Sequence, residues 1–336
     1  TWTITQLADA TGVDGEFADE TEIWTNATGL TRVAVLTNSA VIIFSEQANG
    51  SFIATNLSTQ VQGGTPIAKS MTSFTTADGR VYLAGYTADD QLVTYFQPTA
   101  DSATWAFDNI SEDLTSGGFA TPVLTDLTSY VTSWNQWSIV GLDTNGDIQN
   151  VWVLPGTFEV WRLDNLSDIT GAPELASGLS PILTSWSGIN LTALDADGNL
   201  RVTWWVPSFG GDWVSNDLSD IAQNSGAVDD RVIVEVMTGY ITSWSGMNYA
   251  GVNAEGDLII YWWVPDFGGD WLVSQITDGG SVTGYDPSAD VSSPVSPEGT
   301  LNVVGSGPDG DVLRSSWRPG DAAWGTEVLS TIAEFI

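Results

Sequence analysis

The stretch Thr184–Asp220 reads TSWSGINLTALDADGNLRVTWWVPSFGGDWVSNDLSD, and it recurs at Thr242–Asp278 as TSWSGMNYAGVNAEGDLIIYWWVPDFGGDWLVSQITD. Each copy contains three short runs with the residue pattern of β-strands. In the first copy the turn Asp195-Ala196-Asp197-Gly198 separates the first two runs. A fourth run precedes each copy, at Ser180–Trp186 and at Arg231–Trp244. Four strands repeated at this spacing are typical of a β-propeller blade.

The last strand of the repeat can be followed through the whole chain. An aromatic residue there is followed five positions later by Leu or Ile, and then usually by Ser or Thr; these aromatic residues are Trp2, Phe52, Trp105, Trp161, Trp213, Trp271 and Trp324. Successive aromatic residues of this series are 50 to 58 positions apart; the shortest interval is from Trp2 to Phe52 and the longest from Trp213 to Trp271. Six full repeats and one extra last strand predict an all-β, six-bladed β-propeller of four-stranded blades, with seven blades as the alternative.

We expect residues 1–336 to form a single propeller domain. The repeats run over about 10–59, 60–112, 113–168, 169–220, 221–278 and 279–331. Residues 1–9 are predicted to be a ring-closing strand, which adds a fifth strand to the last blade, replaces its last strand, or belongs to a neighbouring module. No segment has sustained apolar spacing at i, i+3 and i+4, so no helix is predicted.

The composition restricts the partners of the protein. With 42 acidic and 8 basic residues, the net charge is −34, which disfavours binding to nucleic acid and to anionic membranes. No apolar run is long enough to span a membrane. The acid excess, the many Thr, Ser, Asn and Gly residues and the absence of Cys favour an extracellular or cell-surface protein that tolerates high salt.

The residue types present in the chain give little support for a catalytic function. The chain contains no His and no Cys, which excludes imidazole-based triads and thiol nucleophiles, so we expect no enzyme and no catalytic residues. Turns such as Asp143-Thr144-Asn145-Gly146-Asp147 alternate oxygen ligands in the manner of calcium loops. They lack the bidentate Glu at position twelve of an EF-hand, and the same residues suit a tight hairpin. We therefore predict plain turns, no metal site and no cofactor, with calcium as the alternative.

Two groups of tryptophans call for different interpretations. The adjacent pairs Trp204-Trp205 and Trp262-Trp263 point to opposite faces of a sheet and are predicted to lie in the core between blades. Trp134, Trp186 and Trp244 instead end the first strand and follow Thr-Ser, and Thr72-Ser73-Phe74 is aligned with them. A half-exposed indole beside hydroxyl groups can stack on a sugar ring, so these three are candidate ligand-binding residues, with Arg201 as a further candidate in repeat four. The alternative is that they only close the blade at its rim.

Sequons also recur with the repeat. Asn56, Asn109 and Asn165 each begin an Asn-Leu-Ser or Asn-Ile-Ser sequence at the end of a last strand. Repetition of the blade explains these sequences as well as glycosylation does.

One set of residues forms a longer motif within repeat four: Ser185-Trp186-Ser187-Gly188, Leu191 to Asp197-Gly198, Leu200, Trp204-Trp205 and Trp213 to Leu218. This motif resembles the repeat of the bacterial tandem-repeat propeller lectins, a fucose-binding type with Trp-rich repeats. The chain departs from the family where a His precedes the paired tryptophans, since Val202 or Thr203 stands there, and where Leu-Gly-Gly closes the repeat, since Leu218-Ser219-Asp220 stands there. The resemblance implies a propeller with sugar pockets between blades, used in multivalent glycan recognition.

Two functions follow as hypotheses. The first is an extracellular, lectin-like carbohydrate-binding propeller with sites at the blade rims and glycans as partners. The second is a structural or adhesive cell-surface propeller that mediates assembly with other surface proteins, as one module of a larger assembly. The Thr-Ser-Trp unit recurs only in repeats three to five, which favours the first hypothesis for one arc of the propeller.

Overall fold

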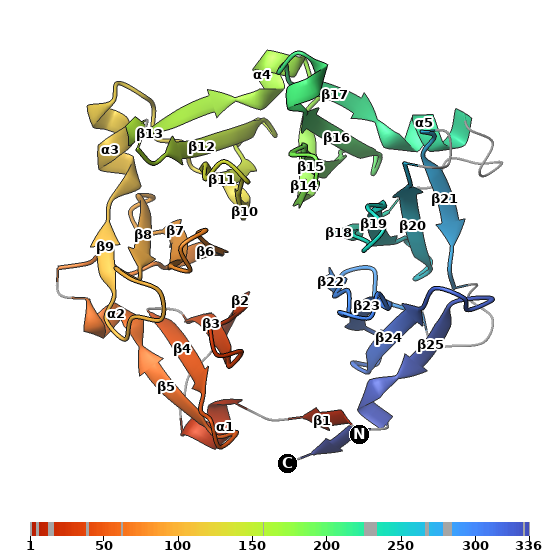
Figure 1. Ribbon diagram of the computed structural model, residues 1–336, viewed down its shortest axis with the longest axis horizontal. Helices are drawn as coiled ribbons and strands as arrows, with labels where there is room; N and C mark the ends of the chain where they lie inside the picture. Colours follow the sequence, from red (N-terminus) through yellow and green to blue (C-terminus); the bar gives the residue numbers. More distant parts are fainter. Residues whose placement is uncertain are drawn as a thin grey trace. The chain divides into compact units, whose positions relative to one another are not determined.

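The computed structural model describes residues 2–4, 7–12, 17–37, 40–61, 63–156, 158–224, 234–265, 269–277, 284–331 and 333–335. Contacts divide the chain into two compact units. The first unit is Thr5–Leu166 with Ile336, and the second is Ser167–Phe335 with Thr1–Ile4. Each unit contains three four-stranded antiparallel sheets (Figure 1). The prediction of an all-β protein with six four-stranded blades is therefore confirmed, while a single domain over 1–336 stays a prediction.

The strands of each blade pair in the order of the sequence. Blade 1 consists of β2 (Phe17–Thr25), β3 (Thr31–Thr37), β4 (Val41–Glu46) and β5 (Phe52–Asn56). Blade 2 consists of β6 (Lys69–Thr75), β7 (Val81–Tyr86), β8 (Leu92–Phe96) and β9 (Ala106–Asp108). Blade 3 consists of β10 (Thr125–Val131), β11 (Trp137–Leu142), β12 (Ile148–Leu154) and β13 (Phe158–Asn165).

The second unit repeats this plan. Blade 4 consists of β14 (Leu175–Leu183), β15 (Ile189–Asp195), β16 (Leu200–Trp205) and β17 (Val214–Asp217). Blade 5 consists of β18 (Val236–Ile241), β19 (Met247–Val252), β20 (Leu258–Trp263) and β21 (Leu272–Gln275). Blade 6 consists of β22 (Val291–Ser292), β23 (Leu301–Ser306), β24 (Val312–Trp317) and β25 (Gly325–Val328).

The extra strand at the start of the chain lies outside the six blades. β1 (Trp2–Ile4) pairs in parallel with β26 (Ala333–Phe335). This pair forms a two-stranded sheet of its own, and blade 6 keeps β25 as its last strand. Among the alternatives left open by the sequence, β1 therefore neither adds a fifth strand to blade 6 nor replaces its fourth.

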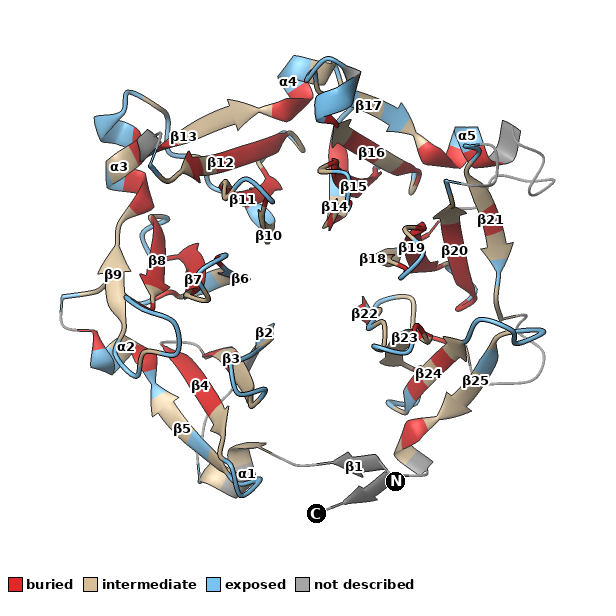
Figure 2. Ribbon diagram, viewed as in Figure 1, coloured by how far each residue is buried: buried red, intermediate tan, exposed pale blue. Residues whose placement is uncertain are grey.

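The second strand of a blade is the centre of its core. Every residue of β7, β11, β15 and β19 is buried. In Figure 2 the second and third strands are the most buried parts of the blades. Both faces of such a strand are covered by protein, so its residues are mostly apolar or small throughout and do not alternate between polar and apolar. Within a unit, the first strands of neighbouring blades lie next to one another: β6 contacts β2 and β10, and β18 contacts β14 and β22.

A glycine near the end of the second strand lets the first strand approach closely. A Cβ added at Gly141 would lie 2.7 Å from the Cβ of Leu124 and 2.8 Å from the carbonyl oxygen of Thr125. The same position is Gly in three other blades, and it is Ala193 in blade 4; the three glycines are Gly85, Gly251 and Gly305. In these four blades the repeated glycine is thus a steric requirement.

The prediction that the chain has no helix is wrong. The described part of the chain contains α1 (Leu7–Thr11), α2 (Leu57–Gln60), α3 (Ile110–Ser116), α4 (Leu166–Thr170) and α5 (Leu218–Asn224), with short 3₁₀ segments η1 (Pro207–Phe209) and η2 (Leu329–Thr331). The helices α2 to α5 each begin directly after the fourth strand of a blade. They are too short to show a 3.6-residue period, and a local cap starts them instead: the side chain of Asn109 accepts the N–H of Glu112, and Asn56 that of Thr59.

The Ser or Thr that follows the Leu or Ile after a fourth strand also ties this segment to the third strand, because its hydroxyl accepts the N–H of the residue that begins that strand. The pairs are Leu92 to Ser111 (2.8 Å), Leu200 to Ser219 (3.0 Å), Val41 to Ser58 (3.2 Å) and Leu258 to Thr277 (2.8 Å). In the helices α2, α3 and α5 the preceding Leu57, Ile110 and Leu218 are buried. The blade itself therefore explains the repetition of these sequons.

Candidate functional site

The candidate tryptophans lie in tight turns between the first and second strands of blades 3, 4 and 5. Trp134, Trp186 and Trp244 are 36 %, 37 % and 37 % exposed. In blade 4 the turn is closed by hydrogen bonds from the N–H of Thr184 to the oxygen of Gly188 and from the N–H of Ser187 to the oxygen of Thr184. The residue after each Trp has a positive φ; these residues are Asn135 (66°), Ser187 (66°) and Ser245 (65°). The turns place all three indoles half-exposed at equivalent points of their blades.

The threonine of Thr-Ser-Trp belongs to the turn. Its buried hydroxyl accepts the N–H that closes the turn, from Gly188 to Thr184 and from Gly246 to Thr242, both at 2.8 Å. The alignment of Thr72-Ser73-Phe74 with this unit is wrong, because these residues lie inside β6. The corresponding turn of blade 2 starts four residues later, at Thr76, and has Asp78 at the position of the tryptophan.

Two of these tryptophans also contact the next blade. The ring of Trp186 lies 5.8 Å from that of Trp263, and the ring of Trp244 lies 5.9 Å from that of Trp317, measured between centroids. Trp263 and Trp317 are the last residues of β20 and β24. The exposed indoles therefore combine a packing role between adjacent blades with a surface open to a ligand.

Arg201 lies away from Trp186. In the sheet, Arg201 is paired with Ala193 of β15. The turn that holds Trp186 leads into Ile189, four residues earlier on the same strand, and Ile189 is paired with Trp205. Four residues along a strand correspond to about 13 Å. The guanidinium is engaged at its own end of the blade by Asp195 (Nε to Oδ2, 2.8 Å) and by Asp217 (Nη2 to Oδ2, 3.1 Å).

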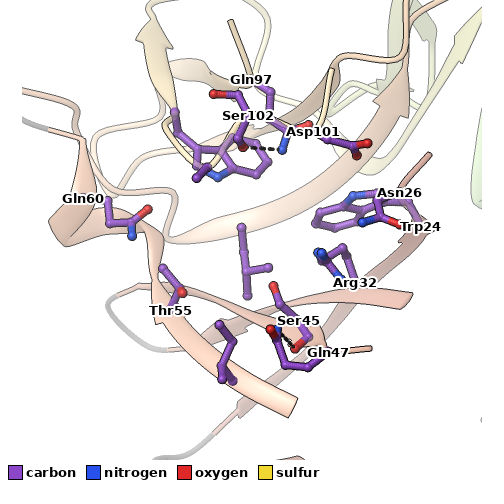
Figure 3. Close-up of a pocket in the computed structure, with 14 residues that line it drawn as sticks. Trp24, Asn26, Arg32, Ser45, Gln47, Thr55, Gln60, Gln97, Asp101 and Ser102 are labelled. Carbon is purple, nitrogen blue, oxygen red and sulfur yellow. Dashed lines mark hydrogen bonds between the residues drawn. The ribbon is translucent and has the colours of Figure 1, made fainter. Parts of the chain in front are cut away.

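The structure shows pockets between adjacent blades, where the resemblance to propeller lectins implied them, but apart from Trp244 the sequence did not indicate their lining residues. The blade 1–2 pocket, in the first unit, has a volume of about 350 Å³ (Figure 3). Blade 1 contributes side chains from its four strands and from α2, and blade 2 contributes Trp105 and the loop before it. The lining residues are Trp24, Asn26, Arg32, Ile43, Ser45, Gln47, Ile53, Thr55, Gln60, Gln97, Asp101, Ser102, Ala103 and Trp105.

Hydrogen bonds organise the polar side of this pocket. Arg32 donates from Nη1 to the carbonyl oxygens of Thr31 and Glu46, both at 3.0 Å, and lies beside Trp24 in Figure 3. A hydrogen bond from the N–H of Thr31 lowers the pKa of Glu46, and the charge of Arg32 adds a smaller effect in the same direction. Asp101 accepts the N–H of Ala27, which ties the loop of blade 2 to the first turn of blade 1.

The blade 5–6 pocket, in the second unit, has a volume of about 370 Å³ and is mainly aromatic and aliphatic. Its lining residues are Thr242, Trp244, Asn248, Ile260, Trp262, Val264, Ser274, Ile276, Leu301, Trp317 and Trp324. The indole of Trp262 donates to Oγ of Ser274 at 3.0 Å, which fixes its ring across the sheet. Trp244 is the one predicted site residue that lines any of the pockets described here.

The blade 2–3 pocket, in the first unit, is smaller, at about 260 Å³. It combines aromatic rings with two carboxylates. Its lining residues are Tyr82, Thr94, Phe96, Asp108, Asp113, Trp137, Val153, Pro155, Gly156 and Trp161.

These three pockets occupy the same place between successive blades. Each uses the second residue of one blade's second strand and that residue's partner on the third strand; the pairs are Arg32 with Ser45, Tyr82 with Phe96, and Asn248 with Trp262. Each also uses the tryptophan that marks the fourth strand of the next blade, namely Trp105, Trp161 or Trp324. One architecture therefore recurs with different side chains.

Sequence reasoning found part of this arrangement. The periodic aromatic residue identified Trp105, Trp161 and Trp324 as members of a repeat, but not as pocket residues. The core role predicted for the paired tryptophans holds only in part, since Trp262 is half-buried and lines a pocket. Arg32 was missed because a single arginine at a repeat position carries no periodic signal.

The acidic turns use their side chains internally. Oδ1 of Asp195 accepts the N–H groups of Asp197 and Asn199, and Oδ1 of Asp143 accepts those of Asn145 and Asp147. Within the described ranges, no three His, Cys, Asp or Glu side chains gather as a metal site would require. In the same part of the chain, no helix is long and apolar enough to cross a membrane.

Comparison with known proteins shows which solved structures share this fold. No protein-family model matches the chain, and no curated protein sequence is similar to it. Among solved structures it is similar to the Aleuria aurantia lectin, described as a six-bladed β-propeller with a fucose recognition mode (15 % identity, TM-score 0.54, covering 94 % of this chain and 97 % of that one).

Two further solved structures agree with this likeness. The BP39L lectin from Burkholderia pseudomallei has 12 % identity and a TM-score of 0.60, over 91 % of this chain and 82 % of that one. The SapL1 lectin, solved with α-methyl fucoside, has 13 % identity and a TM-score of 0.55, over 93 % and 96 %. The likeness shows a six-bladed β-propeller fold and confirms the resemblance to propeller lectins.

Proposed function

We propose that the protein is a lectin-like propeller that binds carbohydrate in the pockets between adjacent blades. The observation that carries this proposal is the recurrence of one pocket architecture three times, each time with tryptophan beside polar groups. A flat indole next to hydroxyl, amide or guanidinium groups suits a sugar, whose CH face stacks on the ring while its hydroxyls form hydrogen bonds.

The size and the fold support small glycan units as ligands. Volumes of about 260–370 Å³ are at the lower end of small-molecule pockets, which suits one sugar residue in each pocket. Solved proteins of the same fold include a lectin in complex with α-methyl fucoside. Methyl α-L-fucoside is therefore the first probe to use.

The half-exposed tryptophans extend this proposal to the blade rims. Trp244 both lines the blade 5–6 pocket and reaches the surface, and Trp134 and Trp186 occupy the same turn in their blades. We propose that these indoles contact the part of a longer glycan that leaves the pocket. Arg201 is not included, because Asp195 and Asp217 hold it at the other end of blade 4.

Binding rather than catalysis is the proposed activity, at an extracellular or cell-surface location. The chain has no His or Cys, and the similar solved structures named above are lectins. Glycans are the proposed partners. Calcium is not part of the proposal, because the carboxylates of the candidate turns accept backbone N–H groups.

A glycan array, run with and without calcium, followed by calorimetry with the best ligand, tests the proposal. Arg32→Gln should remove or weaken binding at the blade 1–2 pocket and leave other sites unchanged. Arg318→Gln is the matched control, because Arg318 is exposed and lines none of the described pockets. The absence of glycan binding by the unmodified protein would overturn the proposal and favour a structural or adhesive surface protein.

A further inference from the structure

The two pockets of the first unit have the same architecture but different charges. Both take residues from the second strand, the fourth strand and the following helix of one blade. At these positions the blade 1–2 pocket has Arg32, Thr55 and Gln60, and the blade 2–3 pocket has Tyr82, Asp108 and Asp113. A guanidinium and two neutral groups are thus replaced by a phenol ring and two carboxylates.

The two carboxylates are placed without a positive charge to balance them. Within the part of the chain that the structure describes, no Lys or Arg lies within ion-pair distance of Asp108 or Asp113. Burial raises the pKa of both groups, and for Asp113 the charges of Asp108 and Glu112 raise it further. A cation between these carboxylates would therefore be favourable.

Aromatic rings form a large part of the remaining wall, beside Thr94, Val153, Pro155 and Gly156. The ring of Tyr82 lies 5.1 Å from that of Phe96 and 4.8 Å from that of Trp137, and Trp161 completes the wall. The guanidinium of Arg80 lies 5.7 Å from the centre of the Tyr82 ring and 5.4 Å from that of the Trp137 ring, so a cation already lies beside these two rings.

The charge of Arg80 does not neutralise the pocket. Arg80 forms an ion pair with Asp78 at 2.9 Å, and it is not among the residues that line the pocket. The local balance, with Asp108 and Asp113 included, therefore remains negative.

We propose that the blade 2–3 pocket binds an organic ammonium group, which contacts the aromatic rings and is balanced by Asp108 and Asp113. Aromatic faces beside carboxylates suit ammonium groups, and about 260 Å³ suits a small head group. A hard metal ion fits less well, because it needs six or more oxygen ligands. The inference does not depend on glycan binding elsewhere in the protein, since an amino sugar and a non-sugar amine share this chemistry.

Calorimetry of the full chain with three probes tests the inference. Tetramethylammonium chloride and glucosamine carry the positive charge, and N-acetylglucosamine is the neutral counterpart of the second. Potassium chloride at the same ionic strength controls for screening of the −34 net charge. At least one of the two cations should bind, about tenfold or more tightly than N-acetylglucosamine or potassium, and the preferred cation identifies the source of the group.

The two pockets supply the matched variant. Asp108→Thr with Asp113→Gln gives the blade 2–3 pocket the residues that the blade 1–2 pocket has at the same positions, and it should weaken ammonium binding at least about tenfold. If the double variant does not fold, Asp113→Gln alone should give a smaller loss. Arg32→Gln, in the other pocket, should leave ammonium binding unchanged. Equal binding of glucosamine and N-acetylglucosamine, no binding of either cation, or full binding by the Asp variants would overturn the inference.

Discussion

Oγ of Ser111 accepts a hydrogen bond from the backbone N–H of Leu92 at 2.8 Å, and both residues are buried. Ser111→Ala would leave this N–H without its acceptor, at a cost of about 1–3 kcal/mol in the free energy of unfolding. Urea denaturation measures the change. Ser116→Ala, at the exposed end of the same helix, is the control and should change stability by less than about 0.5 kcal/mol. Equal effects of the two changes would contradict the fastening role of Ser111.

The glycine of the second strand gives a second prediction. In Gly141→Ala the new methyl would lie 2.7 Å from the Cβ of Leu124 and 2.8 Å from the oxygen of Thr125, so blade 3 must shift. We expect destabilisation of about 1–3 kcal/mol by thermal or urea unfolding. Gly325→Ala is the matched control, because a Cβ there meets no atom within 4 Å and the backbone needs no positive φ. A neutral result for Gly141→Ala would show that the first strand can move away.

The ion pairs of Arg201 predict a pH-dependent effect. Burial works to raise the pKa of Asp195, but hydrogen bonds from Asn199, Arg201 and Asp197 outweigh it and lower the pKa. A lowered folded-state pKa stabilises the fold above the ordinary value of 3.8, and this contribution is lost as the pH falls through the lowered value. Arg201→Gln should therefore cost about 1–3 kcal/mol at pH 7, because Asp195 and Asp217 are largely buried and lose hydrogen bonds from the guanidinium.

The cost of Arg201→Gln should shrink below about pH 4, when Asp195 takes up a proton. Urea titrations of parent and variant at several pH values measure it. A difference that stays constant from pH 7 to pH 3 would show that Arg201 acts through packing alone.

The half-exposed tryptophans predict separable effects on binding and on stability. Replacing Trp134, Trp186 or Trp244 by Ala should cost on the order of 1–3 kcal/mol of sugar binding at the affected site, with the other sites unchanged. Trp186→Ala also removes the ring contact with Trp263, so about 0.5–1.5 kcal/mol of stability should be lost with it. Trp186→Phe keeps an aromatic ring and should restore part of both. A loss of stability without any selective loss of binding would show that the indole only closes the blade.

The net charge of −34 predicts salt tolerance. Dissolved ions screen repulsion among the acidic residues, so the melting temperature should hold or rise as NaCl increases from low to molar concentration. Differential scanning calorimetry at fixed pH measures this response. A marked fall would contradict it.

The repeat of the sequence predicted the fold because blade packing leaves a periodic mark. Every blade needs an apolar second strand and a turn residue such as Gly198, with a φ of 75°, and these needs recur at nearly constant spacing. The short helices left no 3.6-residue period, although the Asn-Leu-Ser or Asn-Ile-Ser sequence that starts some of them recurs. A hydrogen bond from the N–H of Glu112 to the capping Asn109 starts a helix of one or two turns without any amphipathic pattern.

The side chains that line the pockets could not be predicted in the same way, because they are what varies between blades. Arg32, Tyr82 and Asn248 occupy one structural position, and nothing in the local sequence around each indicates that the three are equivalent. The Thr-Ser-Trp unit was visible because it repeats, and it proved to be chiefly a turn whose threonine is buried. Sequence periodicity therefore reveals residues that the fold requires more readily than residues that line a binding pocket.

Each described pocket is shared between two blades, so one blade can line two pockets. Blade 2 supplies Trp105 to one pocket and Tyr82 with Asp108 to the next. Duplicating a blade would therefore add a complete site and raise the valency by one, while a single substitution changes one site only. A ligand that carries two suitable groups at the right spacing would gain avidity from neighbouring sites that are individually weak, without any new contact.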